Sequence, residues 1–253
     1  MSIVLITGGT GQLGTHVVER MRARGHEVRV LSRRARAGTH VGDLSTGAGI
    51  AEAARGADLI VHAATDFRRF GVPDPRQTEH LLAAAGDARH LLYVSIVGID
   101  GIPMRYYRHK LDCERLVEAG ATPYTILRAT QFHDLLAGVL HTVQRLPLAP
   151  LPLDFRFQPV ATIDVAARIA DLVEGDPLGR ADDFGGPEVL TLDRAVEIFR
   201  DQRGGPRRTV RLPVPGRIAR AFRDGVNTCP EHADGVRTFA EFVASTSGNP
   251  YWR

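Results

Sequence analysis

Tyr106 and Lys110 are the residues whose types and spacing most directly suggest chemistry. Four residues make about one helical turn, so a helix that begins near Tyr106 places both side chains on one face. An ammonium beside a phenol lowers the pKa of the phenol from about 10 toward working pH, and it can also hold a ribose hydroxyl. The pair therefore suggests a proton donor and its modulator. The alternative is a tyrosine packed on a helix beside a solvated lysine.

Lys110 is also the only lysine of the chain, because every other member of its 32 lysine and arginine residues is an arginine. Where arginine is used so uniformly, a retained lysine indicates a site that needs a compact ammonium and cannot use a planar guanidinium. Tyr107 competes with Tyr106 for the role of the acid, but it lies three residues from Lys110 and fits the spacing less well.

Ser95 supplies a hydroxyl that could complete such a site. It ends the apolar run 90–95, which predicts a buried strand. A hydroxyl at this strand end could orient a substrate carbonyl for hydride delivery and stabilise the developing oxyanion. His62 also follows an apolar run, 58–61, but there we expect a packed or capping histidine rather than a catalyst.

A glycine-rich turn separates the first expected strand, 3–7, from a helix whose apolar residues recur at helical spacing from Leu13. Gly8 can adopt the positive φ of a sharp turn, Gly11 lets backbone N–H groups approach a pyrophosphate, and Gly14 lets the helix pack closely. The helix N-terminus then faces an anion with its partial positive charge. The predicted phosphate site consists of Gly8, Thr10, Gly11, Gln12 and Leu13. The alternative is an ordinary glycine turn.

The turn after the second expected strand, 27–31, carries Ser32, Arg33 and Arg34. In a dinucleotide-binding fold an acidic residue here would bind the ribose 2′-hydroxyl, whereas arginines pair with a 2′-phosphate. The sequence therefore favours NADP(H) as the cofactor. The alternative is a solvated arginine turn.

Four further residues are expected to line the cofactor. A third strand is expected over 41–44, where Asp43 could reach the adenine amino group and Leu44 could pack on the adenine ring. Ala63 and Ala64 follow the strand 58–61, and side chains this small would let a cofactor approach the backbone.

Strands and helices alternate along the first part of the chain, with helices expected over 50–55 and 73–88 and from 106, and strands over 90–95 and 124–127. Near-continuous apolar strands joined by helices predict an α/β fold, a Rossmann-type doubly wound parallel sheet. Ligands of such sheets bind at the carboxyl ends of the strands. We expect one domain over 1–253, with a cofactor-binding core in 1–145 and a small substrate-side lobe in 146–253.

Beyond residue 145 the pattern is less regular. The proline-rich stretch 146–152 is expected to be an apolar connector that could line a hydrophobic substrate cleft. Pro250, Tyr251 and Trp252 could fold back on that cleft or form a frayed end. Helices are expected over 163–174, from an N-cap at Asp193 to 203, and over 231–244, and strands over 188–192 and 208–212.

Composition argues against several classes of function. The net charge of +3 comes from arginines that belong on a solvated helix face or near a 2′-phosphate, so no nucleic-acid partner is expected. Cys113 and Cys229 lack CxxC spacing and the ten histidines lack paired ligand spacing, so no disulfide or metal site is expected. Because no stretch approaches a membrane span, we expect a soluble, cytoplasmic monomer or homodimer.

Together these residues resemble an atypical short-chain dehydrogenase/reductase of the NmrA-like, NAD(P)-binding type. The stretch 7–14 matches the TGxxGxxG pattern of that family, and Tyr106 with Lys110 fits its YxxxK motif. The segments 93–100, 125–132 and 237–242 also resemble NmrA-like members, so the resemblance covers most of the chain.

The resemblance implies hydride transfer from NADPH to a carbonyl or conjugated alkene of a small, fairly apolar substrate, such as a secondary metabolite. Tyr106 would donate the proton, Lys110 would bind the ribose and tune the tyrosine, and Ser95 would orient the substrate oxygen. Ser95 stands alone where many relatives have a Ser-Ser pair, but its three-residue distance to Gly98 fits the active-site serine. Two alternatives stay open: an NADP(H) redox-sensing regulator without turnover, and an NADP(H)-assisted isomerase or cyclase.

Overall fold

The computed structural model describes residues 1–206 and 208–248 of the 253-residue chain. The chain forms two compact units, and each is assembled from separate segments. The first unit consists of Met1–Ser95, Met104–Arg128 and Val165–Asp182. The second unit consists of Ile96–Pro103, Ala129–Asp164 and the described chain from Asp183 onward.

The first unit is built on a seven-stranded sheet with the order β3-β2-β1-β4-β5-β6-β9. The pairs β1–β2, β1–β4, β2–β3, β4–β5 and β6–β9 are parallel. Because the order proceeds from β1 in one direction and from β4 in the other, the sheet is doubly wound, which confirms the predicted fold class. The strands are β1 (Ile3–Thr7), β2 (Glu27–Ser32), β3 (Thr39–Val41), β4 (Leu59–His62), β5 (His90–Ile96), β6 (Tyr124–Ala129) and β9 (Gly179–Arg180).

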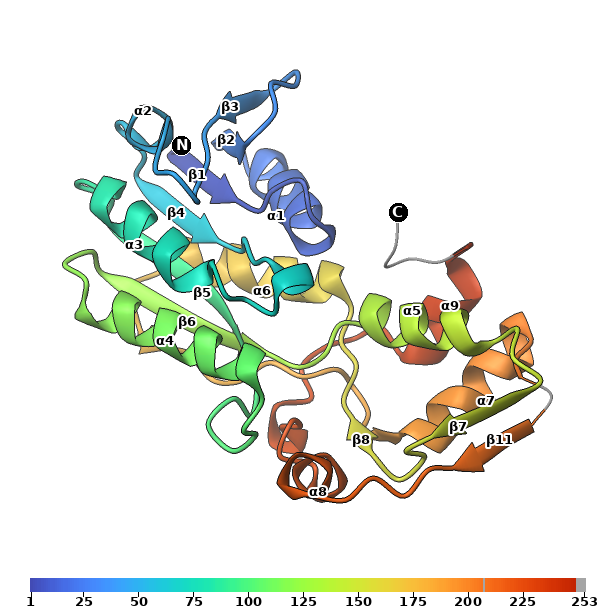
Figure 1. Ribbon diagram of the computed structural model, residues 1–253. Coiled ribbons are helices and arrows are strands. Elements are labelled where there is room, and N and C mark those ends of the chain that lie inside the picture. The colour runs from blue at the N-terminus through green and yellow to red at the C-terminus, as the bar shows by residue number, and fades with distance from the viewer. Residues whose placement is uncertain (207, 249–253) are drawn as a thin grey trace. The chain divides into compact units, whose positions relative to one another are not determined.

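Helices cover both faces of this sheet (Figure 1). The helices α2 (Ile50–Ala54), α3 (Asp74–Ala84) and α4 (Arg105–Ala119) lie along one face, and α1 (Gln12–Ala23) and α6 (Thr162–Glu174) lie along the other. The ends of α1 and α6 are joined where Arg24 donates a hydrogen bond of 2.7 Å to Glu174. This division between faces is what right-handed crossovers in opposite directions produce.

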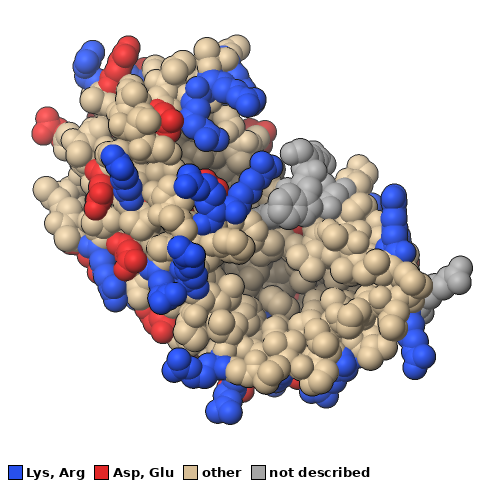
Figure 2. Space-filling view, in the orientation of Figure 1, with Lys and Arg blue, Asp and Glu red and all other residues tan. Residues whose placement is uncertain are grey.

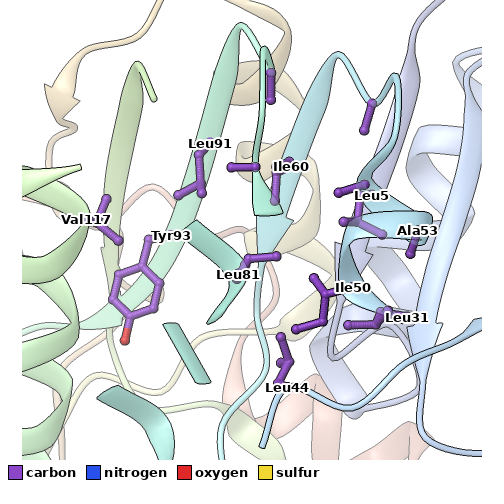
Figure 3. Close-up of a cluster of buried hydrophobic side chains, with 14 of the residues drawn as sticks. Leu5, Leu31, Leu44, Ile50, Ala53, Ile60, Leu81, Leu91, Tyr93 and Val117 are labelled. Carbon is purple, nitrogen blue, oxygen red and sulfur yellow. The ribbon is translucent and has the colours of Figure 1, made fainter. Parts of the chain in front are cut away.

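Apolar side chains fill the space between the sheet and its helices (Figure 3). Leu5, Ile60 and Leu91, from three neighbouring strands, are at most 1% exposed. They belong to one core cluster with Leu81 of α3 and Val117 of α4. Burial of one such side chain contributes about 1.5–3 kcal/mol to stability. Because both faces of the sheet are covered, its central strands contain consecutive buried apolar residues, as Leu59, Ile60 and Val61 do.

The second unit has short strands and its own apolar core. Leu136 and Leu140 pack in one cluster with Phe199 and Phe239. The strands β8 and β10 pair antiparallel, whereas β7 and β11 pair in parallel. The elements of this unit are α5 (His133–Val143), β7 (Leu148–Leu151), β8 (Arg156–Phe157), β10 (Leu190–Thr191), α7 (Leu192–Arg203), β11 (Arg208–Arg211), α8 (Arg217–Asp224), the 3₁₀ turn η2 (Pro230–His232) and α9 (Phe239–Ser245).

The expected elements of the first unit are present, with two larger differences at their ends. β3 covers Thr39–Val41 rather than 41–44, because the chain turns after it and the Asp43 N–H donates to the Ala48 carbonyl at 2.9 Å. α3 ends at Ala84 rather than at residue 88, where the hydrogen bonds tighten to the three-residue spacing of a 3₁₀ turn.

Three expectations for the second half of the chain were wrong or incomplete. The stretch 146–152 is not only a connector, because it contains β7, which pairs with β11 through its backbone. Thr191 caps α7 in place of Asp193, since its hydroxyl accepts the Arg194 N–H at 3.3 Å. The last helix begins at Phe239 rather than 231, where a Thr238–Glu241 capping box fixes its start. The expectation for residues 250–252 lies outside the described residues.

Charged side chains are spread over the surface of the first unit. On the face drawn in Figure 2, basic and acidic side chains are interspersed there rather than gathered into separate patches. Interspersed charges of opposite sign give a weaker surface potential than a patch of one sign. Within residues 1–206 and 208–248, no helix has both the length and the apolar character that crossing a membrane requires.

Candidate cofactor site and active site

The glycine-rich loop after β1 packs against the segment that follows β4. Gly8 has a φ of 73°, in the left-handed region that favours glycine. A Cβ atom on Gly8 would lie 2.7 Å from backbone atoms of Ala63 and Ala64. A Cβ atom on Gly14 would overlap the carbonyl oxygen of Gly8. The positive φ predicted for Gly8 and the close packing predicted for Gly14 are therefore both confirmed.

Helix α1 begins directly after this loop, and its N-cap is Gly11, which has no side chain with which to cap the helix. The Gly11 N–H donates to the Gly8 carbonyl at 2.9 Å and closes the turn. Thr10 is exposed, Gln12 is half-buried and Leu13 is buried. The first turn of α1 is described in full and contains no acidic residue, so its positive end can attract a phosphate group.

The turn after β2 is ordered by Ser32. Its hydroxyl donates to the Arg34 carbonyl at 2.9 Å and accepts the Arg34 N–H at 3.2 Å. The side chains of Arg33 and Arg34 are exposed. Arg33 lines a shallow depression of about 230 Å³ together with Asp43 and Gly49. A guanidinium at the border of a depression can contact a bound anion without the cost of burying its own charge.

Asp43 and Leu44 have different surroundings. The half-buried Asp43 borders the depression, and its carboxylate accepts the Ser45 N–H at 2.8 Å. Leu44 is 9% exposed and packs in the core beside Leu31 and Ile50 (Figure 3). Most of the Leu44 side chain therefore contacts protein, and an adenine contact of either residue stays a prediction.

Tyr106 lies in the first turn of α4 and is half-buried. Its hydroxyl oxygen is 3.2 Å from the hydroxyl of Thr65. Phe67, which starts the 3₁₀ turn η1 (Phe67–Arg69), packs edge-on against the phenol ring at a centroid distance of 5.6 Å. A Cβ atom on Gly71 would lie 2.9 Å from the same ring. The loop between β4 and α3 thus holds the phenol from several sides.

Lys110 lies one turn further along α4 and is 4% exposed. Its ammonium donates to the Val94 carbonyl at 2.8 Å and lies 4.3 Å from the centroid of the Tyr93 ring. Burial lowers the pKa of Lys110. The spacing predicted the shared helix face correctly, but the ammonium contacts Val94 and Tyr93 while the phenol oxygen contacts Thr65. An ammonium has three N–H donors, and Val94 accepts one of them.

Ser95 ends the first unit's portion of β5 and is 3% exposed. Its hydroxyl oxygen is buried without a hydrogen-bond partner among the described residues. This hydroxyl can therefore still donate and accept a hydrogen bond, for example with a substrate oxygen.

Burial separates the two neighbouring tyrosines. Tyr107 is 6% exposed, and burial raises the pKa of its phenol to about 12. A buried phenol of this kind is a poor proton donor near neutral pH. The half-buried Tyr106 is therefore the better candidate for the acid.

His62 is 2% exposed and bridges two threonines. Its Nδ1 atom is 2.7 Å from the Thr7 hydroxyl, and its Nε2 atom is 3.1 Å from the Thr78 hydroxyl. Because the Thr78 hydroxyl donates its hydrogen to the Asp74 carbonyl, Nε2 must donate and Nδ1 must accept. Burial lowers the pKa of His62 to about 3, so this histidine is neutral and packed, as the sequence suggested.

Thr65 and Asp74 also belong to the surroundings of Tyr106, and neither was among the predicted site residues. The Thr65 hydroxyl donates to the Asp74 carboxylate at 2.5 Å. The signal that could have found Thr65 is its place just after the carboxyl end of β4, where ligands of such sheets bind. Asp74 carries no comparable signal, since its partners are set by the path of the loop.

The parallel sheet, the glycine loop and the uncapped start of α1 define a dinucleotide-binding domain of the Rossmann type. The residues fit such a cofactor, because the loop places the start of α1, which no side chain caps, at the carboxyl end of β1, where a pyrophosphate can accept its N–H groups. The chain belongs to the NAD(P)H-binding family, whose model matches residues 8–176, and thus to the atypical short-chain dehydrogenases/reductases. This membership confirms the resemblance seen in the sequence.

Two relatives of known activity are similar to most of the chain. Divinyl chlorophyllide a 8-vinyl-reductase of Oryza sativa subsp. indica is 31% identical over 250 residues, which cover 83% of this chain and 61% of that protein. Ceramide reductase of Caulobacter vibrioides is 26% identical over 243 residues, which cover 85% of this chain and 74% of that protein. The chain therefore spans about three fifths of the length of the plant relatives it matches.

Solved structures share the fold. The NADPH complex of the quinone oxidoreductase QOR2 from Escherichia coli has a TM-score of 0.79 at 17% identity, over 95% of this chain and 98% of that chain. A nucleoside-diphosphate-sugar epimerase from Staphylococcus aureus has a TM-score of 0.77 at 18% identity, over 97% of this chain and all of that chain. Because proteins with different activities share this architecture, the function must be argued from the site.

Proposed function

We propose that the protein is an NADPH-dependent reductase that acts on a carbonyl or conjugated alkene of a small, fairly apolar substrate. The observation that carries the proposal is the half-buried phenol of Tyr106, held in fixed surroundings within the unit that also contains the glycine cradle. The names of two relatives, a vinyl-reductase and a ceramide reductase, support a reduction rather than another use of the cofactor.

The chain's own residues have distinct parts in this proposal. A bound NADPH supplies the hydride. Tyr106 donates the proton, Ser95 uses its otherwise unpartnered hydroxyl to orient the substrate oxygen, and Lys110 binds the nicotinamide-side ribose with N–H donors beyond the one that Val94 accepts. A hydroxyl that gains a partner only when substrate binds costs stability in the free protein and stabilises the complex.

NADPH is preferred over NADH because Arg33 and Arg34 follow β2, where a ribose 2′-phosphate would lie. Neither side chain needs to be uncovered first, since both are exposed. Charge-assisted hydrogen bonds from a guanidinium to a phosphate are stronger than those between neutral groups.

The test is the loss of NADPH absorbance with a panel of quinones, enones and ketones. We expect turnover of at least one of these compounds, and we expect Tyr106→Phe to lower kcat by about 100-fold or more while the Kd for NADPH changes less than about two-fold. Tyr107→Phe is the matched control and should retain most activity, because its phenol is buried. Tight NADPH binding without turnover of any compound would contradict the proposal, and so would a fully active Tyr106→Phe variant.

A further inference from the structure

A chain of hydrogen bonds connects Tyr106 to a buried carboxylate. The Tyr106 and Thr65 hydroxyl oxygens are 3.2 Å apart, and the Thr65 hydroxyl is 2.5 Å from one carboxylate oxygen of Asp74. Asp74 begins α3 and is 3% exposed, whereas Thr65 is exposed. All three residues belong to the first unit.

The chemistry of the three groups determines which group donates in each of these two hydrogen bonds. A hydroxyl has one hydrogen, and an ionised carboxylate can only accept. The hydrogen of Thr65 is therefore used by Asp74, so the contact between Thr65 and Tyr106 requires the phenol to donate. The phenol hydrogen thus points toward Thr65, and the Thr65 hydrogen points toward Asp74.

Further hydrogen bonds hold the loop that carries Thr65 and leads to Asp74. The second carboxylate oxygen of Asp74 accepts the Asp66 N–H at 2.9 Å, and the Asp66 side chain accepts the Arg69 N–H at 3.1 Å. The Gly71 N–H closes the loop on the Asp66 carbonyl at 2.9 Å. One carboxylate oxygen of Asp74 therefore accepts from the Asp66 backbone, and the other accepts from the Thr65 hydroxyl.

The nearby charges are compatible with a carboxylate at this position. Burial lowers the pKa of Lys110, and the negative charges of Asp74 and Glu114 oppose that effect, so Asp74 and the ammonium interact favourably.

We propose that Thr65 transfers a proton between Tyr106 and Asp74, so that Thr65 and Asp74 are positioning residues for the acid. The inference rests on the proposed function, because it assumes that Tyr106 protonates the substrate. After that step the phenolate takes the hydrogen of Thr65, and Thr65 takes the hydrogen of an Asp74 carboxyl group that a hydronium ion of the solvent has protonated. One O–H bond breaks as each new one forms, so the proton that the substrate gains is replaced from solvent, and Asp74 returns to the ionised form that the hydrogen-bond directions require.

The same path also works in the opposite direction, which is the direction that the hydrogen bonds take in the structure. If Tyr106 receives a proton from an alcohol, its own hydrogen moves to Thr65 and that of Thr65 moves to Asp74. The carboxylate becomes a neutral acid, and the phenol is restored. An internal path of this kind matters because bound ligands exclude water from the phenol.

The test compares Thr65→Val, which removes the hydroxyl, with Thr65→Ser, which retains it. Both variants are measured with NADPH and the compound of the panel that is turned over fastest. We expect Thr65→Val to lower kcat by about 10-fold or more, with the KM for NADPH within about two-fold, while Thr65→Ser keeps at least about a third of the kcat. Asp74→Asn, which can still accept hydrogen bonds but cannot take the proton, should resemble Thr65→Val.

A second measurement needs neither substrate nor cofactor. The ionisation of Tyr106 is followed by ultraviolet difference titration of the protein against its Tyr106→Phe variant. Thr65→Val removes the acceptor that holds the phenol hydrogen, so we expect the titration to move to lower pH by about 0.5 unit or more. Thr65→Ser should leave it in place.

The outcomes separate this inference from the proposed function. A Thr65→Val variant with the kcat and the titration of the unmodified protein would overturn the proton path, even if Tyr106→Phe is inactive. If none of the panel is turned over, the proposed function fails, and the titration alone decides whether Thr65 accepts from Tyr106. Equal losses of kcat in Thr65→Ser and Thr65→Val would also overturn the path, because they would assign Thr65 a purely steric part.

Discussion

The two units use their buried polar side chains differently. In the first unit three such side chains, Thr7, His62 and Ser95, lie at or next to the carboxyl ends of neighbouring strands. In the second unit buried amides join segments that are far apart in the sequence. Gln131 and Gln158 are at most 9% exposed, and both contact the chain near residues 227–229.

Gln158 is the best example of this second use. Its amide nitrogen donates to the carbonyls of Gly186 and Cys229 at 2.9 and 3.2 Å, and its oxygen accepts the Cys229 N–H at 2.7 Å. Asn227, which is fully buried, donates to the Gln131 side chain and to the Arg156 carbonyl. These amides satisfy backbone groups that a longer sheet would pair through its own ladder.

The two units satisfy their backbone hydrogen-bonding groups in different ways. Long strands of the first unit pair their backbones with one another, so the polar side chains at their ends are not needed for that pairing. Thr7 contacts His62, and the Ser95 hydroxyl has no partner among the described residues. The second unit has strands of two to four residues, and part of its backbone depends on side chains for hydrogen bonds. Substitutions in the two units should therefore differ in whether they affect binding or stability.

The largest effect on stability is expected from Glu114→Gln in the first unit. Glu114 and Arg128 form an ion pair with bonds of 2.8 and 2.6 Å, and both side chains are 3% exposed. The substitution leaves the buried Arg128 charge without this carboxylate, so we expect unfolding free energy to fall by about 3–5 kcal/mol in urea denaturation. Glu197→Gln, at the exposed Arg194–Glu197 pair, is the control and should cost less than about 0.5 kcal/mol.

Acid should destabilise both units, because each buries a histidine. Burial lowers the pKa of His62 to about 3 and that of His133 to about 4, against about 6.5 in the unfolded chain. Below about pH 6.5 these histidines bind protons in the unfolded state but stay neutral in the folded state, so the free energy of unfolding decreases as the pH falls. From pH 7 to about pH 5 we expect a loss of about 2 kcal/mol from each histidine, measured by denaturation at several pH values.

The pH prediction has an internal control. His133→Gln should reduce the loss between pH 7 and about pH 5 by about 2 kcal/mol, whatever its effect on stability at neutral pH. His62 and His90, whose pKa values burial also lowers, keep contributing to the slope. A slope that is unchanged in this variant would mean that carboxylates or other histidines cause the loss.

Gln158→Leu examines the second unit directly. The change keeps a similar volume but leaves the Cys229 N–H and the Gly186 carbonyl without their amide partner. We expect a loss of roughly 3 kcal/mol in unfolding free energy. Gln202→Leu, at an exposed position of α7, should change stability by less than about 0.5 kcal/mol. If Gln158→Leu lowered the unfolding free energy no more than Gln202→Leu does, that result would contradict the view that buried amides stabilise this unit.

The smallest effect is expected at the strand ends of the first unit. Arg33→Ala should weaken NADPH binding about 10-fold, which corresponds to about 1.4 kcal/mol, and leave the melting temperature unchanged. NADH binding, measured in parallel, should not change, because it lacks the 2′-phosphate. Arg36→Ala is the matched control at an exposed arginine nearby. Equal weakening of both nucleotides would contradict the preference for NADPH.

Much of the first unit was predictable from the sequence because its signals are local. An apolar run such as 3–7 indicates a buried strand, and the spacing of Gly8 and Gly14 indicates the loop. β9 was missed because it has two residues and no apolar run, and it is added to the sheet through backbone contacts such as Ala181 to Ile126.

The remaining features depend on contacts that leave no periodic pattern. The spacing of Tyr106 and Lys110 predicted their shared helix face but not that Val94 and Tyr93 would hold the ammonium. Gln158 meets Cys229 across 71 residues, so neither position reveals the other. Such contacts are set by the path of the folded chain rather than by local preference.

The single lysine has one more consequence, for proteolysis. A protease that cleaves only after lysine finds one such bond in this sequence, inside α4, where Lys110 is 4% exposed. Proteases need an extended segment, so the cut requires α4 to unwind. The cleavage rate therefore measures how often the helix that carries Tyr106 opens, and a nucleotide that binds only the folded protein should slow it.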